Sequence, residues 1–219
     1  MTFDGKALKE GTDYTLSYKN NKAVSGSQTP CVVVNGKGCF KGKIPIYFTI
    51  TAQDLSQMML VSGDKLYKPK ADIYRITPKL MDLDSKLLSA GKDFDKKSIT
   101  YVYENDVLLE NGMSKSAGSA VESTDIIPSD TQIRITLDCG TGSNYKGRFS
   151  GIYRIVKADI KSAKVTIPKQ IYTGKEIVLD KSQITVKYSG VILKPDEFEI
   201  VRYDNNIKKG KASVTLRGT

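Results

Sequence analysis

Two pairs of closely spaced aspartates are the residues of this sequence best suited to acid–base chemistry. Asp82 and Asp84, like Asp93 and Asp95, are two positions apart, so the members of a pair share one face of an extended strand. Two such carboxylates could act as the acid and base of a glycosidase. Aspartate is also common in turns, and Asp84 recurs as Asp4 in the related turn "DGKAL". The sequence therefore favours a role in turns over catalysis.

The other reactive side chains form no recognisable catalytic pattern. The chain has no histidine, which excludes serine and cysteine triads of the usual kind. Cys31, Cys39 and Cys139 lack CxxC spacing, which argues against a zinc site. Cys31 and Cys39 flank "VVVNGKG" and could pair in an exported protein, although three unpaired thiols are the favoured interpretation. The sequence predicts that the chain is not an enzyme and has no cofactor.

Oxygen ligands for calcium are present but dispersed. Asp54 and Asp159 stand at the starts of repeated segments, and asparagine pairs occur at 20–21 and 205–206. No stretch has the dense DxDxDG pattern of a calcium-binding loop. No metal site is therefore predicted.

The elements that carry these residues are repeated along the chain. "GTDYTLSYKNNKAVSG" (11–26) returns as "KPDEFEIVRYDNNIKKG" (194–210), with "GKDFDKKSITYVYEN" (91–105) between them, and 36–50 matches 140–155. The matches define three modules. They are 1–53, the C-terminal part of a module; 54–158, a complete module with an insertion near 106–130; and 159–219, the N-terminal part of a third.

Alternation of apolar and polar residues predicts strands within the modules. It is clear in 14–18 and again in 133–137. Short strands at regular spacing, separated by glycine and asparagine turns, are typical of antiparallel sandwiches. The sequence therefore predicts an all-β chain of tandem β-sandwich modules, with incomplete first and last copies.

Asparagine and tyrosine mark the same turn in each repeat. Asn20 and Asn205 stand where the chain must turn, because asparagine tolerates positive φ. Tyr18, Tyr103 and Tyr203 each precede such a turn and are expected to be equivalent and buried. The third repeat has one more residue before its tyrosine than the first, which predicts a β-bulge.

"YTGKEI" and "GVILKPDEFEIVRYDNNIKKGKASVTLRG", completed by "GKGCFKGKIPIYFTI", resemble the bacterial immunoglobulin-like repeat modules of large surface proteins of Firmicutes and related gut bacteria. The resemblance covers nearly the whole chain outside 106–130. It implies tandem Ig-like antiparallel β-sandwich modules in an extracellular protein of the cell wall or cell surface. Such modules serve as stalks, as adhesive regions, or as accessory domains beside glycoside hydrolases.

The formal net charge of +10 is dispersed among acidic residues, so it indicates a solvated surface and not a nucleic-acid-binding stripe. No apolar run approaches the length of a membrane span. The sequence thus predicts neither nucleic-acid binding nor membrane insertion. The incomplete terminal modules predict head-to-tail self-association, in which the tail of one molecule completes the head of the next.

The insertion is the candidate binding segment, because long loops on rigid scaffolds often carry function. It has a hairpin signal at "VLLENGM" and a serine- and glycine-rich middle that reads as flexible. The candidate ligand-binding residues are Asn105, Asp106, Glu110 and Asn111. A surface loop without a ligand, decorative or partly disordered, is the favoured interpretation.

Two functions follow from these features. The first is a non-catalytic stalk or adhesive segment of a bacterial surface protein, with a host or cell-wall glycan or a protein as ligand. The alternative is an accessory, carbohydrate-binding or spacer region of a secreted polysaccharide-degrading enzyme.

Overall fold

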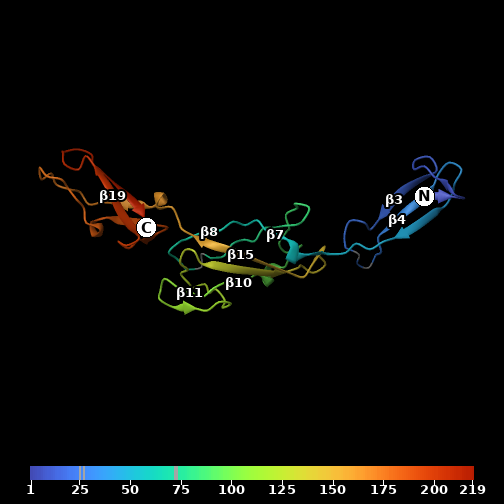
Figure 1. The fold of residues 1–219 in the computed structure, drawn as a ribbon, viewed down its shortest axis with the longest axis horizontal. Coiled ribbons are helices and arrows are strands. Elements are labelled where there is room, and N and C mark those ends of the chain that lie inside the picture. The colour runs from blue at the N-terminus through green and yellow to red at the C-terminus, as the bar shows by residue number, and fades with distance from the viewer. Residues whose placement is uncertain (25, 27, 72–73) are drawn as a thin grey trace. The chain divides into compact units, whose positions relative to one another are not determined.

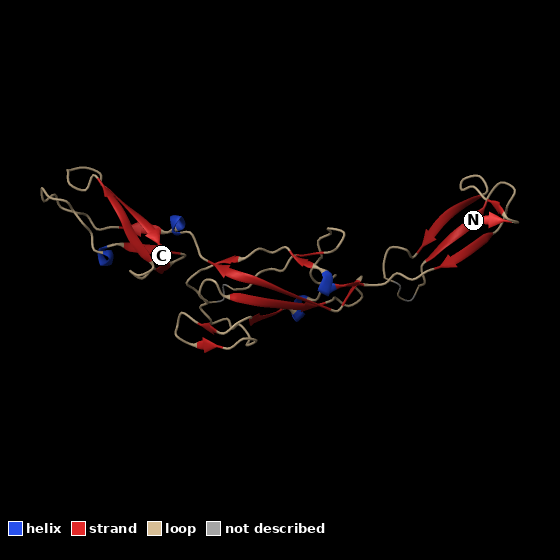
Figure 2. Ribbon diagram, viewed as in Figure 1, coloured by secondary structure: helices blue, strands red, loops and turns tan. Residues whose placement is uncertain are grey.

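The computed structural model describes residues 1–24, 26, 28–71 and 74–219 (Figure 1). Strands and loops make up nearly all of these residues, and each helical segment among them is a three-residue 3₁₀ turn (Figure 2). The predicted all-β class is therefore confirmed. The sheets are small, with two to four strands each.

The first of two compact units consists of Met1–Val61, Pro78–Thr100 and Thr136–Gly151. The strands that lie wholly within it are β1 (Thr2–Phe3), β2 (Lys6–Ala7), β3 (Tyr14–Lys19), β4 (Cys31–Gly36), β5 (Lys43–Tyr47), β6 (Gln53–Asp54), β7 (Met59–Leu60), β9 (Leu80–Met81) and β14 (Tyr145–Lys146). Its 3₁₀ turns are η1 (Leu55–Gln57) and η2 (Lys96–Ser98). β3, β4 and β5 form an antiparallel sheet, and β7 pairs with β9.

The second unit consists of Ser62–Thr77, Tyr101–Ile135 and Ile152–Thr219. Its own strands are β8 (Lys65–Leu66), β11 (Val107–Leu108), β12 (Ser114–Lys115), β16 (Lys164–Thr166), β17 (Thr185–Tyr188), β18 (Val191–Ile192), β19 (Phe198–Asp204) and β20 (Ser213–Gly218). Its 3₁₀ turns are η3 (Ile160–Ser162) and η4 (Lys181–Gln183). β10 (Thr100–Tyr103), β13 (Gln132–Asp138) and β15 (Arg148–Val156) contribute residues to both units, in a sheet of order β10-β13-β15-β8.

The repeated sequence phrase forms a repeated turn. The carboxylate of Asp13 accepts a hydrogen bond from the backbone N–H four residues earlier at 2.8 Å, and that of Asp93 does the same at 2.8 Å. Gly11 (φ 82°) and Gly91 (φ 85°) provide the left-handed residue in the two turns. The sequence similarity thus extends to individual hydrogen bonds.

The predicted turn conformations and the predicted bulge are confirmed. Asn20 and Asn205 have φ of 54° and 56°. The pairing of β19 with β20 shifts register between Ile200 and Arg202, where the additional residue of the third repeat is accommodated.

A buried cluster joins the strands of the C-terminal part of the second unit. Its buried members are Leu179, Ile184, Val186 and Phe198. Val186 belongs to β17 and Phe198 to β19, so side chains from two different sheets share this core. Tyr203 packs against the cluster as a half-buried residue.

Tyr101 occupies a defined position on β10. The backbone N–H of Glu104 donates to the carbonyl oxygen of Gln132 at 3.0 Å, which places Tyr101 opposite Ile135 on β13. The hydroxyl group of Tyr101 donates to the carbonyl oxygen of Ile76 at 2.7 Å.

Tyr203 makes the equivalent contacts on β19. It lies opposite Val214 on β20, and its hydroxyl group donates to the carbonyl oxygen of Leu179 at 3.1 Å. The first repeat places Tyr18 opposite Val32 in the corresponding register. The residue equivalent to Tyr203 is therefore Tyr101, and the predicted equivalence of Tyr103 is wrong.

Burial of the three tyrosines also differs from the prediction. Tyr103 is fully buried and Tyr203 half-buried, but Tyr18 is 57% exposed. Ile46, on the same sheet face as Tyr18, is 49% exposed. Tyr18 is exposed because, in the described part of the chain, no layer covers this end of the sheet.

Candidate functional site

The loops that follow the tyrosine-bearing strands differ in length between repeats. Loop 20–30 joins β3 to β4, loop 205–212 joins β19 to β20, and the much longer segment 104–131 joins β10 to β13. Variable loops on a constant framework are the usual arrangement of a binding region. These loops are therefore the candidate functional site.

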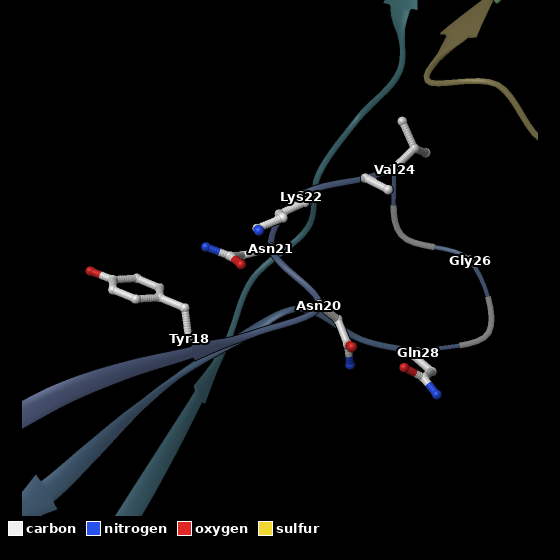
Figure 3. Close-up of a pocket in the computed structure, with 8 residues that line it drawn as sticks. Tyr18, Asn20, Asn21, Lys22, Val24, Gly26 and Gln28 are labelled. Carbon is white, nitrogen blue, oxygen red and sulfur yellow. The ribbon is translucent and has the colours of Figure 1, made fainter. Parts of the chain in front are cut away.

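Described residues of the loop after β3, together with Tyr18, line an open cavity of ≈ 490 Å³ (Figure 3). Its described lining residues are Tyr18, Asn20, Asn21, Lys22, Ala23, Val24, Gly26 and Gln28. Figure 3 shows Tyr18 at the end of β3, with its ring directed away from the loop. The backbone N–H of Val24 donates to the side-chain oxygen of Asn144 at 2.8 Å, which anchors the loop. Amide groups and one ammonium group make this cavity suitable for a polar ligand.

A second cavity, of ≈ 500 Å³, lies beside β19 and β20. Its apolar lining residues are Ile167, Pro168, Ile177, Leu179, Ala212 and Val214. Its cationic lining residues are Lys169, Lys208 and Lys209, and its aromatic ones are Tyr172 and Tyr203. No carboxylate lines this cavity among the residues that the structure describes.

The three lysines of this cavity are exposed and have no ion-pair partner within the described residues. The nearby carboxylate of Glu176 accepts a hydrogen bond from the side chain of Asn206 at 3.1 Å and does not line the cavity. Tyr172 is 62% exposed at the rim. The cavity thus combines an apolar floor with uncompensated positive charge.

The insertion forms a hairpin that is joined to β10. β11 pairs with β12, as the "VLLENGM" signal predicted. The backbone N–H of Tyr103 donates to Ser119 at 3.0 Å, and that of Gly118 donates back to Tyr103 at 2.8 Å. The serine- and glycine-rich middle, which was expected to be flexible, pairs in part with the edge of β10.

A buried carboxylate anchors the end of the insertion. Asp125 is 3% exposed and accepts hydrogen bonds from the Tyr103 hydroxyl at 2.8 Å and the Glu122 N–H at 2.9 Å. Lys115 lies 3.5 Å from the other carboxylate oxygen. Burial, followed by the hydrogen bond to Asp125, raises the pKa of Tyr103 above its ordinary value. The phenol therefore stays protonated and holds the insertion in place.

The structure separates the four predicted ligand-binding residues into two groups. Asn105 and Asp106 line a surface cavity of ≈ 270 Å³ together with Val107, Leu108 and residues 128–132. Glu110 and Asn111 lie in the turn between β11 and β12 and do not line it. One carboxylate oxygen of Asp106 accepts a hydrogen bond from the backbone N–H of Ala117 at 2.8 Å. This oxygen therefore has a structural role within the insertion.

The paired aspartates are engaged with turns. Asp82 accepts hydrogen bonds from the backbone N–H groups of Asp84 at 3.0 Å and Lys86 at 2.9 Å, and from the Tyr145 hydroxyl at 2.8 Å. Burial acts to raise the pKa of Asp82, but these hydrogen bonds outweigh it and hold the pKa below its ordinary value. Asp95 accepts a hydrogen bond from the first turn of η2 at 2.9 Å. These contacts agree with the interpretation of the aspartates as turn residues.

The aspartates that start the second and third modules have the same local role. Asp54 accepts a hydrogen bond from Ser56 at 3.0 Å and caps η1, and Asp159 accepts one from Lys161 at 2.9 Å and caps η3. The hydrogen bond from Ser56 lowers the pKa of Asp54. Within the described residues no three acidic or sulfur ligands gather as a metal site would require.

The three cysteines are free thiols: Cys31 is buried, Cys139 is half-buried and Cys39 is exposed. The favoured interpretation of unpaired thiols is confirmed. No helix in the described part of the chain is long and apolar enough to cross a membrane.

Comparisons with models of protein families, with curated proteins and with solved structures found no match to this chain. The functional argument therefore depends on the residues of the loops themselves.

Sequence reasoning missed the cavity beside β19 and β20. The lysines at 208 and 209 were attributed to a solvated surface, and the segment 167–179 that forms the opposite wall was noted only for its resemblance to a repeat module and not as part of a site. The pair of lysines after an asparagine turn, in the loop equivalent to the insertion, was the feature that could have identified it.

Proposed function

We propose that this chain is a non-catalytic binding segment of an extracellular bacterial surface protein, in which tandem Ig-like β-sandwich modules present variable loops. The main observation behind the proposal is that the turns and hydrogen bonds of the strands are repeated, while the loops that join the strands differ. The Asp13 and Asp93 turns and the Tyr101 and Tyr203 hydrogen bonds recur, whereas the segments after these tyrosines differ in length and charge.

The proposed modules are 1–53, 54–158 and 159–219. Matching backbone hydrogen bonds support this division: the N–H of Gly36 donates to Gly42 at 2.9 Å, and that of Cys139 donates to Gly147 at 3.1 Å. β4 and β5 thus correspond to β13 and β15. The shared core of β17 and β19 supports a two-layer arrangement in the third module.

Two measurements test this function. Antibodies raised against the chain should label intact cells of the source bacterium, because the segment is proposed to be exposed at the surface. The purified chain, screened on glycans and on extracellular host and cell-wall proteins, should bind a defined subset. Labelling only after cell lysis would contradict the proposal.

The alternative function, an accessory carbohydrate-binding region of a polysaccharide-degrading enzyme, is supported by the polar cavity at Asn105 and Asp106. Its lining adds Ser129, Asp130 and Gln132, whose side chains can hydrogen-bond sugar hydroxyl groups. Co-sedimentation with insoluble polysaccharides, compared between the chain and its Asp130→Ala variant, distinguishes this function. Equal retention of both proteins would argue against it.

Head-to-tail self-association stays a prediction from the sequence. Size-exclusion chromatography with light scattering at several concentrations tests it directly. A molar mass near 24.1 kDa at every concentration would exclude it.

A further inference from the structure

We propose that Asn111, in the turn between β11 and β12, is a site of spontaneous modification in the folded protein. Its side-chain amide is converted to a carboxylate after attack by the backbone nitrogen of the next residue. The sequence contains two asparagines followed by glycine, Asn35-Gly36 and Asn111-Gly112. Glycine has no Cβ to obstruct this attack, so these two pairs are the candidates. The structure separates them, and the inference is independent of the proposed function.

The reaction needs no enzyme and consumes water. The backbone nitrogen of Gly112 loses its proton to hydroxide and forms a bond to Cγ of Asn111. The bond from Cγ to the amide nitrogen then breaks, and this nitrogen takes up a proton from water and leaves as ammonia. Water opens the resulting cyclic imide at either carbonyl group, which gives aspartate or isoaspartate. Asparagine is among the residue types that are chemically labile on heating.

Asn111 and Gly112 are exposed residues of a short turn. The backbone N–H of Gly112 donates to the carbonyl oxygen of Leu109 at 2.9 Å, and Gly112 has a left-handed φ of 82°. In the described part of the chain, the side chain of Asn111 makes hydrogen bonds to Met113 alone. Its oxygen accepts from the Met113 N–H at 3.1 Å, and its nitrogen lies 3.4 Å from the Met113 sulfur. The amide is therefore held only within its own turn.

Few contacts have to break before the nitrogen of Gly112 can attack. Opening of the turn breaks its hydrogen bond to Leu109, while the contact between Asp125 and Tyr103 that anchors the insertion stays in place. Nothing lies within 4 Å of a Cβ added at Gly112, so this side of the turn is open to water. Exposed turns open locally at much lower free energy than the whole fold. The reaction at Asn111 therefore does not require unfolding of the protein.

Asn35 is held in place by a sheet. It lies on β4, which pairs with β3 on one side and β5 on the other. Its side-chain nitrogen donates to the hydroxyl oxygen of Ser17 at 3.1 Å and to the carbonyl oxygen of Val33 at 3.2 Å. The backbone N–H of Gly36, which would have to attack, donates to Gly42 at 2.9 Å. Attack at Asn35 therefore requires that β4 separate from its neighbours.

The modification changes both the charge and the backbone of the hairpin. A neutral amide at Asn111 becomes a carboxylate next to Glu110, so two like charges then stand side by side in the turn. The aspartate product keeps an oxygen that can accept from the N–H of Met113. Isoaspartate adds one carbon to the main chain, which disturbs the register in which Val107 lies opposite Lys115. The hairpin of the insertion thus acquires negative charge with time.

The experiment incubates the full chain at mildly alkaline pH and follows both asparagines by mass spectrometry of its proteolytic peptides. Circular dichroism confirms that the chain stays folded. Asn111 should be converted at least about tenfold faster than Asn35, because local opening of a turn is more frequent than separation of a sheet. A blocked synthetic peptide of residues 107–115, "VLLENGMSK", gives the rate without the fold and should react faster than the folded chain. In denaturant the two asparagines should react at similar rates.

The matched control variant is Gly112→Asn. Asparagine tolerates the positive φ of this position, and the added Cβ meets no atom within 4 Å, so the turn is kept. The new side chain obstructs the attacking nitrogen, and conversion of Asn111 should become several-fold slower. The proposal would be overturned by equal rates at Asn35 and Asn111 in the folded chain. Conversion of the peptide without conversion of folded Asn111, or an unchanged rate in the variant, would also overturn it.

Discussion

The hydroxyl group of Tyr203 is hydrogen-bonded to both backbone groups of Leu179: it accepts from the N–H at 2.9 Å and donates to the carbonyl oxygen at 3.1 Å. A single side chain therefore satisfies the polar groups of an extended segment that has no strand partner at this residue. This contact joins β19 to Leu179, and both Tyr203 and Leu179 line the cavity beside β19 and β20.

Removal of this hydroxyl should destabilise the third repeat. We expect Tyr203→Phe to lower the free energy of unfolding by about 1–3 kcal/mol, because two partly buried backbone groups lose their partner. Urea denaturation of both proteins measures the difference. Tyr18→Phe is the matched control and should change stability by less than about 0.5 kcal/mol, since Tyr18 is 57% exposed. Equal effects of the two substitutions would contradict the assigned contact.

Tyr103 should be costly to truncate. It is fully buried and bonded to Asp125, so Tyr103→Ala should destabilise the chain by roughly 3–5 kcal/mol. Tyr103→Phe keeps the ring and should cost about 1–2 kcal/mol. Chemical denaturation provides both values. A loss below about 1 kcal/mol for Tyr103→Ala would show that the insertion is not anchored there.

The turn at Asp82 should make stability depend on acid pH. The folded state holds the pKa of Asp82 below its ordinary value of 3.8, so its contribution is present above that pH and is lost as pH falls through the folded pKa. Asp82→Ala should cost about 1–3 kcal/mol at neutral pH. The difference in free energy of unfolding between the two proteins is measured by chemical denaturation as a function of pH. This difference should become smaller only at pH values below the ordinary pKa of aspartate. A difference in stability that does not change with pH would show that the charged carboxylate of Asp82 is not the stabilising form.

Gly140 should not tolerate a side chain. An added Cβ would lie 2.5 Å from the carbonyl oxygen of Lys92, which is backbone and cannot move aside. We expect Gly140→Ala to destabilise the chain by about 1–3 kcal/mol. Gly63→Ala is the control, because nothing lies within 4 Å of its added Cβ. Thermal unfolding of both variants tests whether this close approach occurs.

The thiols should differ in reactivity. Cys39 is exposed and should react first with a thiol reagent, Cys139 more slowly, and buried Cys31 only after denaturation. Timed labelling followed by mass spectrometry of peptides establishes the order. If Cys31 and Cys39 react only after a reducing agent is added, the two residues had instead formed a disulfide.

Much of the fold could be predicted from local rules. Residues Asn20 and Asn205 adopt the positive φ that their turns require, and the additional residue of β19 becomes a bulge. The tyrosine alignment failed because η2 inserts three residues between Phe94 and Tyr101. If those three residues are left out, Phe94 and Tyr101 have the same spacing as Tyr14 and Tyr18. The repeat is therefore present in the sequence, but the additional turn shifts its alignment.

The candidate site was less predictable, for a physical reason. Asn105 and Asp106 were found because they border an obvious insertion, but the wall formed by 167–179 has no periodicity. Burial of Asp125 against Tyr103 also depends on a pairing between the insertion and β10 that no local pattern encodes.

The unequal loops have a practical consequence for protein engineering. The framework accepts either eight residues at 205–212 or the much longer segment 104–131 between equivalent strands. Because the entropy cost of closing a loop rises only slowly with its length, the position after Tyr203 is a natural acceptor for foreign epitopes. Grafting there would convert this repeat into a display scaffold while leaving the remainder of the chain unchanged.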